Sequence, residues 1–218
     1  MIQLVVFLGN YGSEYSKTRH NVAWQFLDSL PFSSRFSWQQ KFKGEFLSFS
    51  REELSSLFCE SKILCAKDGS PVKVIDNAPP KVYFLKPLTY MNNSGLSAIE
   101  LASFFKIKPE EILVVHDELE MSLGFVSLKF SGGLGGHNGL RSMKSVFNTP
   151  DFWRLRFGLS KPSGVDIADY VLSPFSQDER IVLDSVFTQT HNLFAEILLS
   201  SSPEKLLQNW SKKKLCEL

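Results

Sequence analysis

Cysteine is scarce in this chain: three occur among 218 residues, at Cys59, Cys65 and Cys216. None belongs to a C-x-x-C pair, and their spacing matches no common zinc site. An odd and low count is typical of reduced cysteines that act as small apolar side chains. The cysteines therefore exclude a disulfide-stapled scaffold, and we expect a cytoplasmic protein without a metal site.

Long apolar runs and an excess of one charge are also missing. No apolar stretch approaches the roughly 18–20 residues that span a bilayer, and the N-terminus leads into an apolar strand without a basic region or a cleavage site. Lys and Arg total 24 against 23 Asp and Glu, a formal net charge of +1. We therefore expect a protein that neither enters a membrane nor coats DNA. A local basic patch is still compatible with this balance, because a patch depends on where the charges lie.

Several common catalytic signatures are absent. There is no G-K-S or G-K-T of a Walker A loop, and the segment G-L-G-G-H-N over 133–138 is not G-x-G-x-x-G. No G-x-S-x-G motif presents a serine nucleophile. His116, Asp117 and Glu118 could hold a metal ion, but no well-spaced third ligand accompanies them. Nothing here predicts a nucleotide, a metal ion or another cofactor.

What the chain does contain is an alternation of strand and helix patterns. Apolar runs and period-two alternation predict strands over 2–8, 41–49, 63–66, 82–85, 112–115, 125–130 and 152–159. Helical spacing predicts helices over 20–30, 94–106, 138–147, 166–172, 176–200 and 203–210, and the lysine run 212–214 is expected to fray. We therefore predict one α/β domain over 1–218, a three-layer sandwich whose mixed, mostly parallel sheet is flanked by helices, as in phosphorylase/hydrolase-like folds.

Polar side chains gather in four segments that begin where predicted strands end: 9–21, 87–95, 116–120 and 131–139. In open α/β sheets, ligands bind at the carboxyl ends of the strands. Each residue alone has an ordinary explanation, such as a structural histidine, a helix cap or a tight turn. Their shared edge of the sheet is what predicts a functional site. Its central members are His20, Asp117, Asn10, Asn92 and Asn138.

A histidine and a carboxylate without a nucleophile predict hydrolysis by activated water. Asp117 would hold the proton on one ring nitrogen of His20, which leaves the other nitrogen to take a proton from water. The asparagine amides would donate hydrogen bonds to a carbonyl or to the oxyanion that forms from it.

Five motifs resemble those of bacterial peptidyl-tRNA hydrolase. They appear in the order of that family and extend over nearly the whole chain. They are G-N-x-G-x-x-Y-x-x-T-R-H-N from Gly9, T-Y-M-N-x-S-G from Thr89, H-D-E-L from His116, G-G-x-G-G-H-N-G from Gly132 and F-x-R-L-R-x-G from Phe152. The resemblance implies cleavage of the ester between a peptide and the 3′ end of tRNA, which recycles prematurely released peptidyl-tRNA. It also implies a monomer.

The resemblance further implies roles for single residues. His20 would be the catalytic base, Asp117 would orient it, and Asn10 would help to distinguish peptidyl-tRNA from free aminoacyl-tRNA. Positions that bind the tRNA or the peptide end, or that line the cleft, are Tyr15, Tyr90, Met91, Asn92, His137 and Asn138.

Two basic residues match positions that clamp the tRNA 5′-phosphate. Lys129 and Arg156 both lie on the polar faces of their predicted strands. Phosphate contacts position an RNA without reading its sequence. We therefore expect recognition of the acceptor end rather than of tRNA identity.

The sequence departs from the family pattern at several positions. Phe7 stands where glycine is common, Tyr11 where proline is usual, and Ser127 where many members have lysine. Extra residues lie between 43 and 86, and we expect them to enlarge a hairpin near 50–80, away from the cleft.

Two other functions are compatible with parts of this pattern. One is a non-catalytic RNA- or protein-binding module on the same fold, although such a role does not require intact His20, Asp117 and Asn10. The other is a peptidase on a phosphorylase-like fold, which the missing zinc cluster disfavours.

Overall fold

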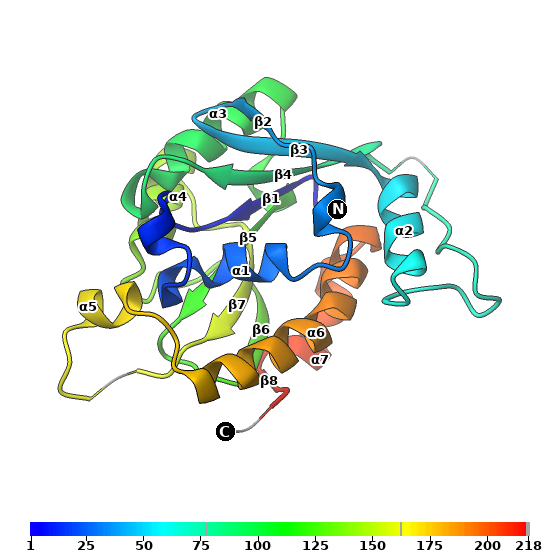
Figure 1. The fold of residues 1–218 in the computed structure, drawn as a ribbon. Helices are drawn as coiled ribbons and strands as arrows, with labels where there is room; N and C mark the ends of the chain where they lie inside the picture. Colours follow the sequence, from blue (N-terminus) through cyan, green and yellow to red (C-terminus); the bar gives the residue numbers. More distant parts are fainter. Residues whose placement is uncertain (77, 162, 217–218) are drawn as a thin grey trace.

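The computed structural model describes residues 1–76, 78–161 and 163–216. Within them, eight strands form one sheet in the order β2-β3-β4-β1-β5-β7-β6-β8 (Figure 1). The strands are β1 (Leu4–Phe7), β2 (Gln39–Lys41), β3 (Gly44–Ser50), β4 (Lys81–Pro87), β5 (Ile112–Glu118), β6 (Phe125–Phe130), β7 (Trp153–Gly158) and β8 (Lys213–Lys214). The four central strands, β4, β1, β5 and β7, are parallel. The outer strands pair antiparallel, so the predicted mixed sheet is confirmed, with its parallel part at the centre.

Helices cover both faces of the sheet, as the three-layer prediction requires (Figure 1). Alternate residues of β1 belong to different cores: Val5 and Phe7 pack with one set of helices, and Leu4 and Val6 with the other. The first set is α1 (Val22–Asp28), α2 (Arg51–Glu60), α6 (Gln177–Leu199) and α7 (Leu207–Trp210). The second set is α3 (Ser94–Phe105) and α4 (Asn138–Phe147). The short helix α5 (Ile167–Leu172) follows β7 in the chain.

Phe7, the last residue of β1, points into the core between the sheet and α6. Its side chain is fully buried, and its ring meets those of Phe84 and Phe194 edge-on, with ring centroids 5.5 and 6.1 Å apart. Aromatic rings prefer such edge-to-face contacts. The bulk of Phe7 is therefore accommodated on the helix side of the sheet.

We expect Phe7→Ala to lower the free energy of unfolding by about 3–5 kcal/mol, because truncation of a buried phenyl ring leaves a cavity. Urea denaturation followed by circular dichroism measures this change. Phe104, which is 60% exposed, provides a matched control, and Phe104→Ala should change the same free energy by only about 0.5 kcal/mol. Equal losses in the two variants would contradict the core position of Phe7.

The predicted strand over 41–49 is wrong at its start, because a hairpin turn interrupts it. Phe42 and Lys43 have φ angles of 57° and 51° and form the turn between β2 and β3. A two-residue turn with both φ angles positive matches the twist of the two strands it joins. Neither residue is the glycine or asparagine that usually marks such a turn. The sequence therefore gives no sign of the turn, and the alternating phenylalanines predict one uninterrupted strand.

The segment between β3 and β4 also differs from its prediction. The strand predicted over 63–66 is wrong: that part of the chain is a loop, in which Ile63 N and Leu64 N donate to Phe58 O at 2.9 and 3.4 Å. Before it comes the unpredicted helix α2, which begins with a capping box between Ser50 and Glu53. The pattern S-x-x-E is a recognised helix start, so the sequence did contain this signal.

The C-terminal lysines are ordered, contrary to the expectation that they would fray. Lys213 and Lys214 form β8 and pair with β6 at the edge of the sheet. Leu215 N continues the pairing by donating to Gly124 O at 2.8 Å. Among the described residues, no helix has the length and apolar character needed to cross a membrane.

Candidate active site

Seven of the eleven predicted site residues line a pocket at the carboxyl ends of β1 and β5, where ligands bind in folds of this kind. The pocket has a volume of about 550 Å³. Residues from the loop after β1, the turn before α3, the end of β5 and the start of α4 line it. Seven of the predicted residues are among them: Asn10, His20, Met91, Asn92, Asp117, His137 and Asn138.

His20 and Asp117 form a buried hydrogen-bonded pair. His20 lies in a 3-10 turn over Arg19–Asn21 that precedes α1, and Asp117 is the penultimate residue of β5. The distance from His20 Nδ1 to Asp117 Oδ1 is 2.9 Å. An ionised carboxylate only accepts hydrogen bonds, so Nδ1 carries the proton and Nε2 has a free lone pair. This arrangement prepares Nε2 to act as a base.

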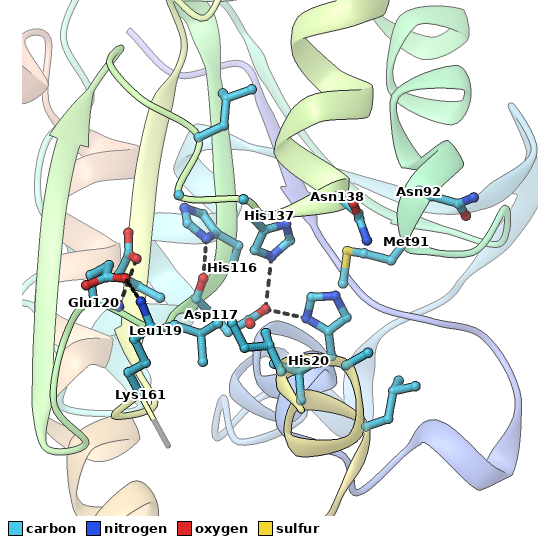
Figure 2. A pocket seen from close by; sticks show the side chains of 18 of the residues that line it. His20, Met91, Asn92, His116, Asp117, Leu119, Glu120, His137, Asn138 and Lys161 are labelled. Atoms are coloured by element: carbon cyan, nitrogen blue, oxygen red, sulfur yellow. Dashed lines mark hydrogen bonds and ion pairs between the residues drawn. The ribbon is translucent and has the colours of Figure 1, made fainter. Parts of the chain in front are cut away.

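His137 is the second donor to the same carboxylate oxygen (Figure 2). Its Nε2 lies 3.0 Å from Asp117 Oδ1. Its other nitrogen, Nδ1, caps α4 by accepting from the backbone N–H groups of Gly139 and Leu140, at 3.0 and 3.3 Å. A nitrogen that accepts has no proton, so these contacts define the tautomer of His137 and direct its N–H to Asp117. The sequence placed His137 in the cleft but did not indicate this bond.

The charges of the pair support each other. Burial lowers the pKa of His20, but the charge and hydrogen bond of Asp117 outweigh it and raise that pKa above its ordinary value. Burial raises the pKa of Asp117, and the two facing histidines, His20 and His137, more than offset this and hold it well below its usual range. Asp117 is therefore ionised at neutral pH, and His20 gains a proton more readily than a free histidine does.

A third histidine, His116, lies behind the pair. Its Nδ1 is 2.5 Å from the backbone carbonyl of Asp117, to which it donates. Burial, followed by the neighbouring His137, lowers the pKa of His116 well below its ordinary value, so its ring is neutral. Within the described residues, its buried Nε2 has no hydrogen-bond partner.

The same three side chains could also be considered as metal ligands. One ligand atom from each of His20, Asp117 and His137 can be chosen so that all lie within 4.8 Å of one another. In the hydrogen-bonded arrangement, however, both nitrogens that face Asp117 carry protons. A metal ion would have to displace those protons, because histidine binds metals through an unprotonated nitrogen. Base chemistry by His20 and metal binding are therefore alternatives at this cluster.

Asn10 is held in place by its backbone and its side-chain oxygen. Its backbone N–H donates to Asn21 Oδ1 at 2.9 Å, and its backbone carbonyl accepts from Asn21 Nδ2 at 2.8 Å. Its Oδ1 accepts from the N–H of Met91 at 2.8 Å. The side-chain NH₂ of Asn10 thus provides the donors for a ligand in the pocket. Asn21 is fully buried and positions Asn10, a role that its place in the motif did not predict.

The turn that carries His20 is anchored by Arg19. The Arg19 guanidinium donates to Ser173 Oγ and Pro174 O, both at 2.6 Å, and pairs with Glu179 at 2.7 Å. Its Cζ also lies 4.3 Å from the centre of the Tyr170 ring. These partners belong to α5, α6 and the segment between them. A buried, multiply bonded arginine therefore fixes the base relative to the α5 wall of the pocket.

Neither predicted asparagine at the rim is a helix cap. A helix cap is the ordinary explanation for an asparagine at such a position, but Asn93 precedes α3 and His137 caps α4. Asn92 and Asn138 are both exposed, and Asn138 Oδ1 accepts from Arg141 at 2.9 Å. Figure 2 shows Asn138 and Met91 beside His20 and His137. The bond from Arg141 to Oδ1 fixes the orientation of the Asn138 amide, and its NH₂ group takes no part in capping α4.

The tyrosines lie beside the pocket rather than lining it. Tyr90 packs against Tyr11, with ring centroids 4.4 Å apart, and meets Tyr15 edge-on at 6.4 Å. Tyr90 has a φ of 56°, which is unusual for a bulky residue. Tyr11 was noted in the sequence only as a departure from proline, and the structure makes it part of an exposed aromatic cluster next to Asn10.

Lys129 and Arg156 lie outside the pocket, on one face of the sheet. Cross-strand pairing places Ser127 opposite Arg156 and Lys129 opposite Arg154, so all four side chains share that face. Arg156 donates to Glu118 at 3.1 Å and to Ser127 Oγ at 2.7 Å. Its charge is therefore partly compensated by Glu118.

The glycine-rich loop is attached to this face by Arg154. This arginine is fully buried and donates to Gly133 O and Gly132 O at 2.6 and 3.0 Å. Gly132 has a φ of 99°, and a Cβ there would lie 2.9 Å from Lys129 Nζ. Lys129 could move aside, but the positive φ would strain any side chain at this position, so the turn favours glycine. Arg154 thus positions the loop that leads to His137, a role that strand alternation alone did not predict.

Comparisons with known proteins identify the family of this chain. The family model described as peptidyl-tRNA hydrolase matches residues 4–217. The chain is 41% identical to peptidyl-tRNA hydrolase of Treponema pallidum over 223 residues, which cover 100% of this chain and 98% of the relative. It is 38% identical over 204 residues to that of Neisseria meningitidis serogroup A, with 93% and 94% covered.

Solved structures give the same result. A crystal structure of peptidyl-tRNA hydrolase in complex with N-propanol superposes with a TM-score of 0.76 at 30% identity, covering 96% of this chain and 94% of the other. The enzyme from Acinetobacter baumannii gives a TM-score of 0.75 at the same identity and coverage. By sequence and by fold, the chain belongs to the peptidyl-tRNA hydrolase family.

Proposed function

We propose that this enzyme hydrolyses the ester between a peptide and the 3′ end of tRNA, with His20 as the base that activates water. The observation that carries the proposal is the bonded pair of His20 and Asp117, which leaves Nε2 of His20 available in the pocket. The ester substrate comes from the family to which the chain belongs.

The chemistry follows from that pair. His20 Nε2 takes a proton from water as the water oxygen attacks the ester carbonyl carbon, and Asp117 stabilises the imidazolium that forms. The tetrahedral intermediate then expels the 3′ oxygen of the tRNA, to which the His20 imidazolium returns the proton. The products are a free peptide acid and deacylated tRNA, and the base is regenerated.

Amide donors near His20 supply the remaining contacts. The NH₂ groups of Asn10 and Asn138 can donate to the peptide carbonyl and to the oxygen that becomes negatively charged. The side chains of α5 that line the pocket, among them Ile167, Val171 and Leu172, offer an apolar wall for the peptide side chains. Lys129 and Arg156 are proposed to bind the 5′-phosphate, with Arg156 exchanging part of its contact with Glu118 for phosphate.

We expect N-acetylaminoacyl-tRNA to be cleaved at least about a hundredfold faster than unblocked aminoacyl-tRNA, because a charged α-amine would face the amide donors of Asn10 in place of a neutral carbonyl. A difference of about 2.7 kcal/mol, the cost of one mismatched charged contact, gives this ratio. The assay is the release of each labelled acyl group in EDTA, with Asn10→Ala expected to reduce the ratio.

Three results would contradict the proposal. They are equal cleavage of both substrates, loss of turnover in EDTA with recovery on adding zinc, and binding of peptidyl-tRNA without turnover. The second would favour a metallopeptidase-like mechanism, and the third would favour a non-catalytic RNA-binding module.

A further inference from the structure

Two of the three cysteines, Cys59 and Cys65, are brought together at the end of α2. Cys65 Sγ lies 3.4 Å from the backbone carbonyl oxygen of Cys59, to which its thiol donates. Both are free thiols, and Cys65 is exposed while Cys59 is half-buried. Two neighbouring thiols, one of them open to solvent, are the starting arrangement for disulfide exchange.

The backbone turn between the two cysteines is fixed by the C-terminus of α2. Lys62 has a φ of 56°, and its N–H donates to Cys59 O at 2.9 Å. The N–H of Ile63 donates to Phe58 O, also at 2.9 Å. These two bonds form a Schellman motif, which ends a helix and turns the chain back on itself. Ile63 also packs against the core, so the chain that leads to Cys65 starts from a fixed position beside α2.

The loop after Cys65 then folds back along α2 and covers Cys59. Ser55 Oγ donates to Val72 O at 2.7 Å, and Cys59 Sγ lies 3.3 Å from Gly69 O. Two side chains of α2 therefore hold this loop in place. The cover explains why Cys59 is the less accessible thiol of the pair, and it leaves Cys65 as the sulfur that a reagent in solution reaches first.

The Cys65 thiol also changes the ionisation of Cys59. Its hydrogen bond with Cys59, followed by burial, raises the pKa of the Cys59 thiol to about 11. Cys59 therefore keeps its proton at neutral pH as long as Cys65 is a thiol. A reagent that reacts at Cys65 removes this hydrogen bond and leaves its product beside a second thiol.

We propose that Cys59 and Cys65 form a reversible thiol–disulfide site that is oxidised by low-molecular-weight disulfides. The Cys65 thiolate attacks one sulfur of the small disulfide, which gives a mixed disulfide and releases one small thiolate. Cys59 then loses its proton and attacks Cys65 Sγ, and the second small thiolate leaves and takes up a proton. The two protein thiols give up two electrons, which reduce the small disulfide to two thiols.

The pair lies away from the catalytic pocket. Figure 1 shows α2 on the opposite side of the molecule from α5, whose residues line the pocket. Distant sites without shared contacts act independently. Oxidation of the pair should therefore leave kcat for N-acetylaminoacyl-tRNA within about twofold of its value in the reduced enzyme. A large loss of kcat would contradict a site that is separate from the pocket.

The test incubates the full-length enzyme with glutathione disulfide under native conditions and measures its intact mass. We expect the wild type to lose about 2 Da, the mass of two hydrogen atoms, and to regain it with dithiothreitol. Trypsin cleaves after Lys62, between the two cysteines, so the oxidised enzyme should yield peptides 52–62 and 63–67 joined by a disulfide. Cys59→Ser should instead accumulate glutathione on Cys65, because no second thiol displaces it.

Cys216→Ser is the matched control, since it removes the third cysteine and leaves the pair intact. This variant should lose the same mass as the wild type and yield the same joined peptides. The mass measurement needs no turnover, so it tests the site whether or not the enzyme cleaves peptidyl-tRNA. A stable glutathione adduct on Cys65 of the wild type, or a mass loss that requires Cys216, overturns the inference.

Discussion

Replacement of His20 by alanine is expected to lower kcat for N-acetylaminoacyl-tRNA by about 10²–10⁴-fold, the usual contribution of a positioned general base. The side chain supplies Nε2 as the base, and the neighbouring His137 cannot take over this role because its Nε2 donates to Asp117 and its Nδ1 accepts from the backbone of α4. KM should change little, because the amides and the basic face still bind the substrate. The measurement is the rate of acyl release under saturating substrate.

His191 provides the matched control for this loss. It is the one histidine of the four in the sequence that lies outside the pocket, where it contacts Ser29 Oγ at 3.0 Å. Burial lowers its pKa to about 4, so it is neutral like the active form of His20. His191→Asn should keep kcat even if the melting temperature falls. If His20→Ala retained most of the wild-type rate, another group would have to be the base.

Asp117→Asn is expected to produce a loss of similar size, about 10²–10⁴-fold in kcat, together with a shift in the pH profile. Asparagine keeps the shape of the side chain but removes the charge that stabilises the His20 imidazolium. In the wild type, the pKa of His20 is raised, so kcat/KM should rise with pH through a midpoint above the ordinary histidine value of about 6.5.

The direction in which Asp117→Asn shifts the midpoint of the pH profile follows from two opposing effects on the pKa of His20. Burial lowers its pKa and Asp117 raises it, so removal of the carboxylate charge leaves the effect of burial. The midpoint of the variant should therefore fall below the ordinary value, while its plateau rate also falls. A variant with a lower rate but an unchanged midpoint would show that Asp117 acts only by position. A profile independent of pH would contradict a titrating base.

Regular patterns predicted their elements well. The alternation over 125–130 and the apolar spacing over 138–147 match β6 and α4 at both ends. Both segments combine a strong period with clear breaks on either side. The four apolar residues at 63–66 have no such support, because the strands β3 and β4 that flank this loop in sequence already pair with each other. Whether a short apolar run becomes a strand depends on a partner that the local sequence does not contain.

In the candidate site, too, some features were predictable from the sequence and others were not. The rule that parallel strands end at one edge was enough to bring His20, Asp117 and Asn10 together. The bonds that fix them were not predictable, because they depend on how rings and amides are rotated in the fold. His137 shares Asp117 with His20, and Arg154 holds a loop rather than facing solvent. Side-chain orientation of this kind is decided by tertiary contacts between distant segments.

The order of strands at the centre of the sheet has a consequence for when the enzyme becomes active during synthesis. β5 and β6 follow each other in the chain, yet β7 lies between them. The hydrogen bonds of β5 on the Asp117 side therefore remain open until residues 153–158 have been made. His137 and its loop are held over the site by Arg154, which belongs to that same late strand. An N-terminal fragment that ends before β7 therefore contains His20 and Asp117, but it lacks both the strand that pairs with β5 at Asp117 and the arginine that holds the loop before His137. We expect such a fragment to be inactive.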